Sequence, residues 1–264
     1  MTLKRRATAS GALSSRLWGN GNARLTRPRT ICNAVTSDKP RHDGVVMAVK
    51  EFAENPSLFL KRNLVIQLAN VGEGDTFAKD RTYFYVIPYE NVWMKTQGGE
   101  FGDVPVRRFD RGSAKVYVMK CSKEKVEHGV AGYWLAYQQN QSHQVTIGTD
   151  AEYVFTPTVD GCTIGVGPSN GFGGHILSHI NRGGWKANDQ QVIEAKRISG
   201  ENAVILDAGS YQKWEAWDLV PDNKIKTTVW GERTGNDWRF FYQSYRVTGG
   251  FQYTWLGVKS FPML

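Results

Sequence analysis

The amino-acid sequence predicts an α+β fold, with a strand-dominated core of packed mixed β-sheets (a β-sandwich) and peripheral helices. Most apolar residues fall in short runs rich in β-branched and aromatic residues, and clusters of Gly, Asn, Asp or Pro separate these runs. Only one longer segment shows clear helical spacing. With 264 residues, 41% of them hydrophobic and 12% aromatic, the chain can bury a sizeable core in one large domain or two small ones.

The first 41 residues differ in composition from the rest of the chain. They carry much of the formal net charge of +8 and contain a single acid, Asp38. They are rich in Ser, Thr, Arg, Gly and Asn and show no hydrophobic period. We therefore expect residues 1–41 to form a basic, disordered N-terminal leader and residues 42–264 to form a single domain. Because no basic patch with interleaved aromatic residues follows the leader, we expect no nucleic-acid partner.

The elements follow in chain order from residue 43. Residues 43–55 predict a helix because Val45, Val49 and Phe52 recur at helical spacing behind a capping Asp. Pro56 ends this helix or opens a short turn. Residues 190–197 fit a strand or a short helix, and we expect strands at 63–70, 81–89, 114–121, 132–138, 144–148, 153–156, 162–167, 175–180, 203–207, 227–231, 238–245 and 251–258. The turn cluster at 234–237 pairs the strands beside it, and the aromatic segment 214–220 fits no element clearly.

The strongest chemical signal lies in residues 146–184. Cys162 follows a glycine at the start of a predicted strand, and the returning strand carries His175 and His179. A thiol attacks as its thiolate, and a neighbouring imidazole supplies that form near neutral pH. This layout predicts a nucleophile and a base on adjacent strands. The alternative is that Cys162 is a small buried apolar residue, as many lone cysteines are.

The two histidines cannot both meet the thiol. His175 and His179 lie on one face of the strand, roughly 13 Å apart by strand rise, and Asn181 shares that face. Their spacing is also that of the two histidines in HExxH zinc sites, but Ile176 stands where the glutamate would be. Gly174 further argues against a helix here, so we expect no metal.

The cysteine count and the hydropathy exclude several classes of protein. The three cysteines (Cys32, Cys121 and Cys162) give neither a disulfide framework nor a CxxC metal pair, which suits a reducing compartment. No apolar run approaches the roughly 18 residues of a membrane helix, and the basic N-terminus lacks the apolar region of a secretory signal. We therefore expect no membrane span and no classical signal peptide.

A family resemblance rests on TDAEYVFTPTVDGCTIGVG followed by LSHIN. This pattern resembles the cysteine-histidine glutamine deamidase toxins, the family of the cytotoxic necrotizing factor catalytic domain and of Burkholderia lethal factor. The shared features are an acid-bearing turn, an aromatic strand ending in Thr, a short loop to Gly-Cys and a strand carrying the histidine. They correspond to Asp150, 153–156, Gly161–Cys162 and 176–181; the later stretch 227–243 also looks like a strand pair of such domains. Asp160 departs from the Ser that the toxins commonly carry before this Gly.

The resemblance implies an activity and roles for three residues. The protein would be a bacterial virulence effector, a hydrolase that deamidates a glutamine of a host protein through a thioester, without a cofactor. Cys162 would be the nucleophile, His179 the general base and then the acid, and the backbone carbonyl of Thr156 would orient the histidine. The known members act on small GTPases or a translation-initiation helicase. We therefore expect a secreted effector that acts in the host cytosol and resides in the bacterial cytoplasm before export.

Some choices stay open at this point. The distance in sequence from Cys162 to His179 is longer than in the family, which leaves His175 as an alternative base to the preferred His179. Thioester chemistry requires an oxyanion hole, and the candidate donor is the backbone N–H of Cys162, with Gly161 and Asn181 nearby. A cysteine peptidase or transglutaminase would use the same pair. A lectin-like, strand-rich binding module would instead hold Cys162 buried and inert, and a family member without activity would fit Asp160.

Overall fold

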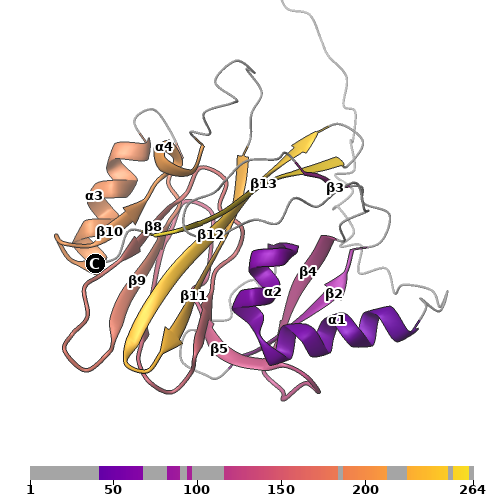
Figure 1. Cartoon of the computed structure of the whole chain (residues 1–264). Coiled ribbons are helices and arrows are strands. Elements are labelled where there is room, and N and C mark those ends of the chain that lie inside the picture. The colour runs from indigo at the N-terminus through magenta and orange to yellow at the C-terminus, as the bar shows by residue number, and fades with distance from the viewer. Residues whose placement is uncertain are drawn as a thin grey trace, which may run out of the picture. The chain divides into compact units, whose positions relative to one another are not determined.

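The computed structural model describes residues 42–67, 82–89, 94–96, 116–183, 187–212, 225–248 and 252–261. All of them belong to one compact unit, Pro40–Leu264. The expected leader, residues 1–41, and the aromatic segment 214–220 lie outside the described residues. Within the unit, two β-sheets form the core and helices lie at their periphery, which confirms the predicted α+β class (Figure 1).

The larger sheet has nine strands and is mixed. Its β1–β4, β5–β7 and β13–β3 pairs are parallel, and its other pairs are antiparallel. In spatial order the strands are β1 (Leu64–Gln67), β4 (Val116–Ser122), β2 (Thr82–Pro88), β5 (Val130–Trp134), β7 (Tyr153–Phe155), β11 (Ile225–Thr234), β12 (Asp237–Thr248), β13 (Gln252–Ser260) and β3 (Met94–Thr96).

This sheet curls until its β1 edge meets its own middle, so that it is nearly a closed barrel. The Thr228 hydroxyl on β11 donates to the Val65 carbonyl at 2.9 Å, and the Val65 N–H donates to Gln243 Oε1 on β12 at 3.4 Å. The Thr158 N–H donates to the Gln67 carbonyl at 2.9 Å. These bonds give the edge strand partners for its main-chain groups, which an exposed edge would leave unpaired.

The smaller sheet is antiparallel and carries the residues singled out by the sequence. Its strand order is β10 (Val204–Leu206), β8 (Thr163–Val166), β9 (His175–Ile180) and β6 (Ser142–Ile147). Helix α3 (Ala187–Ser199) covers one face. A Cβ at Gly165 would lie 2.7 Å from Ser178 Oγ and 3.2 Å from the Ala195 Cβ, so only glycine allows this helix so close. The other face packs on the larger sheet through Ile164 and Phe240.

Two helices pack on the larger sheet near β1 and β2. Helix α1 (His42–Glu54) is followed at once by α2 (Pro56–Arg62), and the Asn55 side chain caps α2 by accepting from the Leu58 N–H at 2.9 Å. Pro56 therefore opens a helix, in the first-turn position that proline tolerates. Phe52 and Phe59 meet edge to face at 5.7 Å and anchor both helices in the core.

Most strand predictions are confirmed within a few residues, and residues 175–180 match β9 in full. The segment 190–197, which fits either a strand or a helix, lies in α3. The turn at 234–237 joins β11 and β12 as expected, with Thr234 opposite Asp237. Strand β3 and the four-residue helix α4 (Ala208–Tyr211) have no counterpart among the predicted elements.

Candidate functional site

The pairing of β8 with β9 brings Cys162 and His179 to the same face of the smaller sheet. Thr163 lies opposite Ile180 and Ile164 opposite His179, so the same register continued by one residue sets Cys162 opposite Asn181. Because side chains alternate along a strand, Cys162 and His179 are diagonal neighbours on one face. That face packs on the larger sheet. The expected placement of thiol and imidazole on adjacent strands is thus present.

The thiol of Cys162 is buried and contacts Asn181. Its residue is only 2% exposed, and Asn181 Nδ2 donates to Sγ at 3.1 Å. Burial raises the pKa of the thiol, while the hydrogen bonds from Asn181 and from the main chain of Asp160 act in the opposite direction and lower it. Cys162 therefore rests as a neutral thiol, and its thiolate forms only when a base takes the proton.

The chain just before the thiol is held by two side chains from distant segments. The Gly161 N–H donates to the Tyr211 hydroxyl at 2.7 Å, and that hydroxyl donates to the Cys162 carbonyl at 3.1 Å. Gln191 Nε2 donates to the carbonyls of Gly161 at 3.0 Å and Arg182 at 3.2 Å. Gly161 has a φ of 86°, the left-handed region that glycine adopts without strain. The peptide that carries the Cys162 thiol is therefore fixed from both sides.

The imidazole of His179 is buried and hydrogen-bonded to the side chain of Thr156. The residue is 1% exposed, and its Nδ1 lies 2.7 Å from the Thr156 hydroxyl oxygen. Burial, and secondarily the nearby His143, lowers the pKa of His179 to about 3, so the ring is neutral. The resemblance implied that the Thr156 carbonyl orients this histidine; in the structure the contact is made by the Thr156 hydroxyl instead.

The second ring nitrogen of His179 is available for chemistry. Within the described part of the chain, its Nε2 is buried and has no hydrogen-bond partner, so the Cys162 thiol is not bonded to it. When Nδ1 carries the proton and donates to Thr156, Nε2 presents a lone pair. A buried acceptor without a partner costs stability unless a proton or a donor reaches it. In that tautomer, Nε2 can accept one more hydrogen bond.

His175 has a structural role at the far end of β9. Its Nδ1 lies 2.8 Å from the Gly167 carbonyl, which can only accept, so Nδ1 carries the proton and donates. Its partner across the sheet is Ile147 of β6. His179 lies opposite Ile164, next to Cys162, whereas His175 lies four residues further along β9, beyond Leu177. The geometry therefore favours His179 as the candidate base.

Four residues of this site were not expected from the sequence: Tyr137, His143, Gln191 and Tyr211. Asn181 was expected near the histidine but bonds to the thiol, and it also donates to the Tyr137 hydroxyl at 3.4 Å. The Tyr137 ring lies 5.3 Å from that of His179. The pairing of β6 with β9, had it been predicted, would have placed His143 in the site. Gln191 of α3 and Tyr211 of α4 reach the site through tertiary packing, which the sequence does not indicate.

Asp160, the departure from the toxin pattern, is half-exposed at the rim of the site. Its carboxylate lies 3.8 Å from Lys226 Nζ. The negative charge raises the pKa of Cys162, whereas the main chain of the same residue lowers it. The two effects act against each other, so Asp160 does not by itself stabilise the thiolate.

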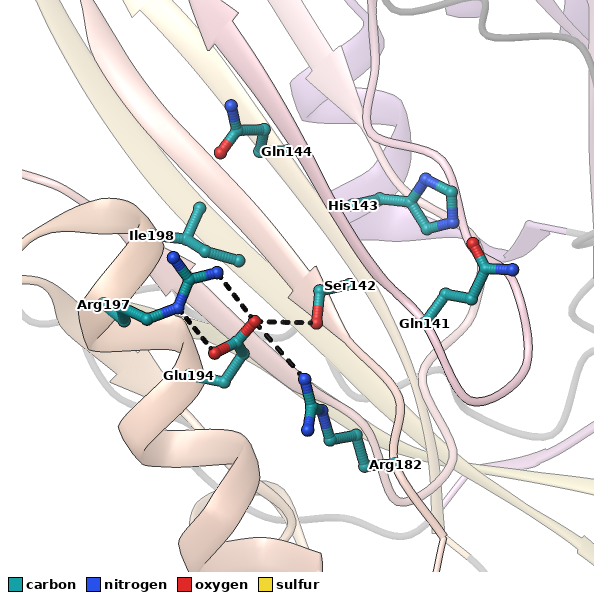
Figure 2. Close-up of a pocket in the computed structure, with 8 residues that line it drawn as sticks. All are labelled: Gln141, Ser142, His143, Gln144, Arg182, Glu194, Arg197 and Ile198. Carbon is teal, nitrogen blue, oxygen red and sulfur yellow. Dashed lines mark hydrogen bonds and ion pairs between the residues drawn. The ribbon is translucent and has the colours of Figure 1, made fainter.

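A polar pocket of about 530 Å³ lies on the opposite face of the smaller sheet, between β6 and α3. We call it the Glu194 pocket; its lining residues are Gln141, Ser142, His143, Gln144, Arg182, Glu194, Arg197 and Ile198 (Figure 2). Arg197 donates to Glu194 through Nε at 2.8 Å and Nη2 at 2.9 Å, and Ser142 donates to it at 3.3 Å. Arg182 Nη2 lies 3.5 Å away.

Two features are absent from the residues that the structure describes. No group of three or more His, Cys, Asp or Glu side chains there is placed to hold a metal ion. No helix in those ranges is long and apolar enough to cross a membrane.

Comparison with known proteins identifies no relative of this chain. No protein-family model matches the chain, and a search of curated proteins finds no match.

Proposed function

We propose that the protein is a toxin of the effector type that deamidates a glutamine side chain of a target protein, with Cys162 as the nucleophile and His179 as the base. The observation that carries the proposal is the placement of Cys162, just before β8, and His179 of β9 on one face of the sheet. Nδ1 of His179 lies at Thr156, and Nε2 has no hydrogen-bond partner among the described residues. The resemblance of the sequence to the deamidase toxins supports the same pair.

The reaction follows from ordinary thiol chemistry. Nε2 of His179 takes the proton of the thiol, and the Cys162 sulfur adds to the carboxamide carbon of the substrate. His179 then donates this proton to the substrate nitrogen, and the C–N bond breaks. Ammonia departs, and the acyl group remains on Cys162 as a thioester. Water adds to the thioester as His179 takes its proton, the C–S bond breaks, and the proton returns to the sulfur. The product is a glutamate side chain.

Asn181 is positioned to assist the addition step. Its side-chain N–H lies at the sulfur, next to the carbon that the sulfur would attack, where an oxyanion forms. With the backbone N–H of Cys162 as a second donor, Asn181 would stabilise this oxyanion. One such donor is typically worth about a hundredfold to a thousandfold in turnover.

The resting state is a neutral pair, because burial raises the pKa of Cys162 and lowers that of His179. Proton transfer therefore requires the sulfur to leave Asn181 and come within hydrogen-bond reach of Nε2. Catalytic hydrogen bonds are often long without substrate and tighten when it binds. The site thus becomes reactive as the carboxamide arrives and replaces the thiol at Asn181.

The proposed partner is a protein in a host cell. The resemblance to the deamidase toxins supports this, and it makes small GTPases and a translation-initiation helicase the first targets to test. It supports equally a secreted effector that acts in the host cytosol.

A second candidate function is a strand-rich binding module in which Cys162 is inert. The burial of Cys162 favours this alternative, since a residue that is 2% exposed is typical of a cysteine used for packing. Reactivity of the thiol in the folded protein separates the two functions.

Exposure of a cell lysate to the protein tests the proposed activity. Peptide mass spectrometry would show a glutamine converted to glutamate in one target, with no cleavage of its chain. We expect the conversion with the wild type and not with Cys162→Ser or His179→Gln. Cleavage of the target, or a crosslink, would instead indicate a peptidase or a transglutaminase.

A further inference from the structure

His143 lies directly opposite the proposed base, on the edge strand of the smaller sheet. The register of β6 and β9 pairs His143 with His179, so both side chains are on the face that also carries Cys162. Directly opposed residues of an antiparallel pair have Cβ atoms about 5 Å apart. The two imidazoles are therefore neighbours, although they are 36 positions apart in the sequence.

His143 is less buried than His179. It is half-buried, whereas His179 is fully buried, and its strand β6 forms one wall of the Glu194 pocket. Figure 2 shows the His143 ring on the other side of β6 from Glu194 and Arg197, as strand alternation requires. Within the described residues, the Nε2 of His143, like that of His179, is buried and without a hydrogen-bond partner.

The charged and titratable groups around His143 come from β9, from α3 and from the segments that follow β5 and β9. His179 of β9 shares its face, and the Tyr137 ring packs against His179 on that side. On the other face of the sheet, Glu194 and Arg197 of α3 and Arg182 after β9 form a mutual ion cluster. Glu194 lies on the opposite face and is paired with both arginines. Among the described residues, no carboxylate is paired with His143.

We propose that His143 is a positioning residue of the candidate site, which sets how readily His179 takes a proton and so couples the reactivity of Cys162 to the protonation of His143. The inference rests on the proposed function in one respect: it takes His179 as the acceptor of the thiol proton.

The sign of the effect follows from charge. Burial lowers the pKa of His143 below its ordinary value, so the ring is neutral near pH 7 and becomes charged only in acid. A charged His143 repels a second positive charge on the opposite residue and thus opposes protonation of His179. On acidification, His179 would therefore stay neutral, and able to accept the thiol proton, to a lower pH than in a protein without His143.

Nuclear magnetic resonance of labelled histidine ring nitrogens tests this coupling directly. The comparison is between the wild type, His143→Gln and a matched control, His128→Gln, which replaces an exposed histidine beside Glu127. We expect the titration midpoint of His179 to rise by roughly one pH unit in His143→Gln, as loss of a like charge at this separation predicts. The control should leave the midpoint unchanged.

Alkylation of Cys162 by iodoacetamide across pH gives a second measurement on the same proteins. On acidification, the rate should begin to fall at a higher pH in His143→Gln than in the wild type, because His179 is protonated earlier there. If His143→Gln does not fold, His143→Asn serves as a second neutral replacement. An unchanged His179 midpoint in the folded variant would overturn the proposal. A shifted midpoint with no alkylation of any folded protein would leave the coupling in place and contradict the proposed function instead.

Discussion

Thr156 decides how the candidate base is presented. Its hydroxyl is the partner of His179 Nδ1 and therefore fixes the ring orientation in which Nε2 has no hydrogen-bond partner among the described residues. In other acid–base sites the partner of the histidine is often a carboxylate, which also stabilises the imidazolium. A neutral hydroxyl gives orientation without that charge, in keeping with the low pKa of His179.

Replacing the Thr156 hydroxyl by a methyl group tests this role. Thr156→Val keeps the shape but leaves Nδ1 of a buried ring without a partner, which costs about 1–3 kcal/mol of stability. We expect slower alkylation of Cys162 as well, because the ring is no longer fixed. Thr156→Ser retains the hydroxyl and should keep most of the reactivity. Equal reactivity of the Val and Ser variants would show that the hydroxyl does not orient His179.

The contact between Asn181 and the thiol makes a prediction about pH. Asn181 lowers the pKa of Cys162, against the larger effect of burial, so its removal should raise that pKa further. The pH at which alkylation reaches half its maximum rate should therefore be higher in Asn181→Ala. Asn188→Ala is the matched control, because that side chain bonds to Asp207 and not to the thiol. A midpoint that moves down, or equally in both variants, contradicts the assignment.

At the scale of elements, the β8–β9 pair could be predicted and its surroundings could not. The alternating residues and the Gly-rich loop between Cys162 and His175 indicate two strands joined locally, and local pairing brings thiol and imidazole together. Tyr211 and Gln191 reach the same loop from α4 and α3, and no spacing in the sequence encodes such tertiary contacts. The parallel pairing of β1 with β4 was likewise not readable.

The short segment before β8 depends on the backbone freedom of Gly161. A side chain there would meet no heavy atom within 4 Å, so the cost of Gly161→Ala is the strain of a positive φ, about 1–2 kcal/mol. We expect thermal unfolding to show this loss, together with altered alkylation of Cys162. Gly148→Ala, whose nearest contact would be an ordinary 3.5 Å, is the control. A larger loss at Gly148 would show that the loop conformation is not constrained as described.

For the whole molecule, the α+β class followed from composition and strand pattern, whereas the nine-strand order and the curl of the large sheet came from long-range pairing. One consequence of burying His179 concerns global stability. Its pKa is about 3 in the folded protein and about 6.5 when unfolded. Between these values the unfolded chain binds the extra proton, so stability falls as the pH falls.

Denaturant unfolding at a series of pH values measures this dependence. We expect the wild type to lose about 2 kcal/mol between neutral pH and pH 5 through His179, since each pH unit within this range costs about 1.4 kcal/mol. His179→Gln should show a shallower slope, whatever its absolute stability. The same slope in both proteins would mean that His179 is not buried in its neutral form.

The most direct test of the Cys162–His179 pair is the rate at which iodoacetamide labels each cysteine of the native protein near neutral pH, followed by peptide mapping. Cys121 is the internal reference, because burial raises the pKa of this half-buried thiol to about 11. We predict that Cys162 is labelled faster than Cys121 and that His179→Gln slows this labelling about a hundredfold, the size of a general-base effect. Labelling of Cys162 only at the rate of global unfolding, and equally in both proteins, would contradict the proposed chemistry and favour the inert binding module.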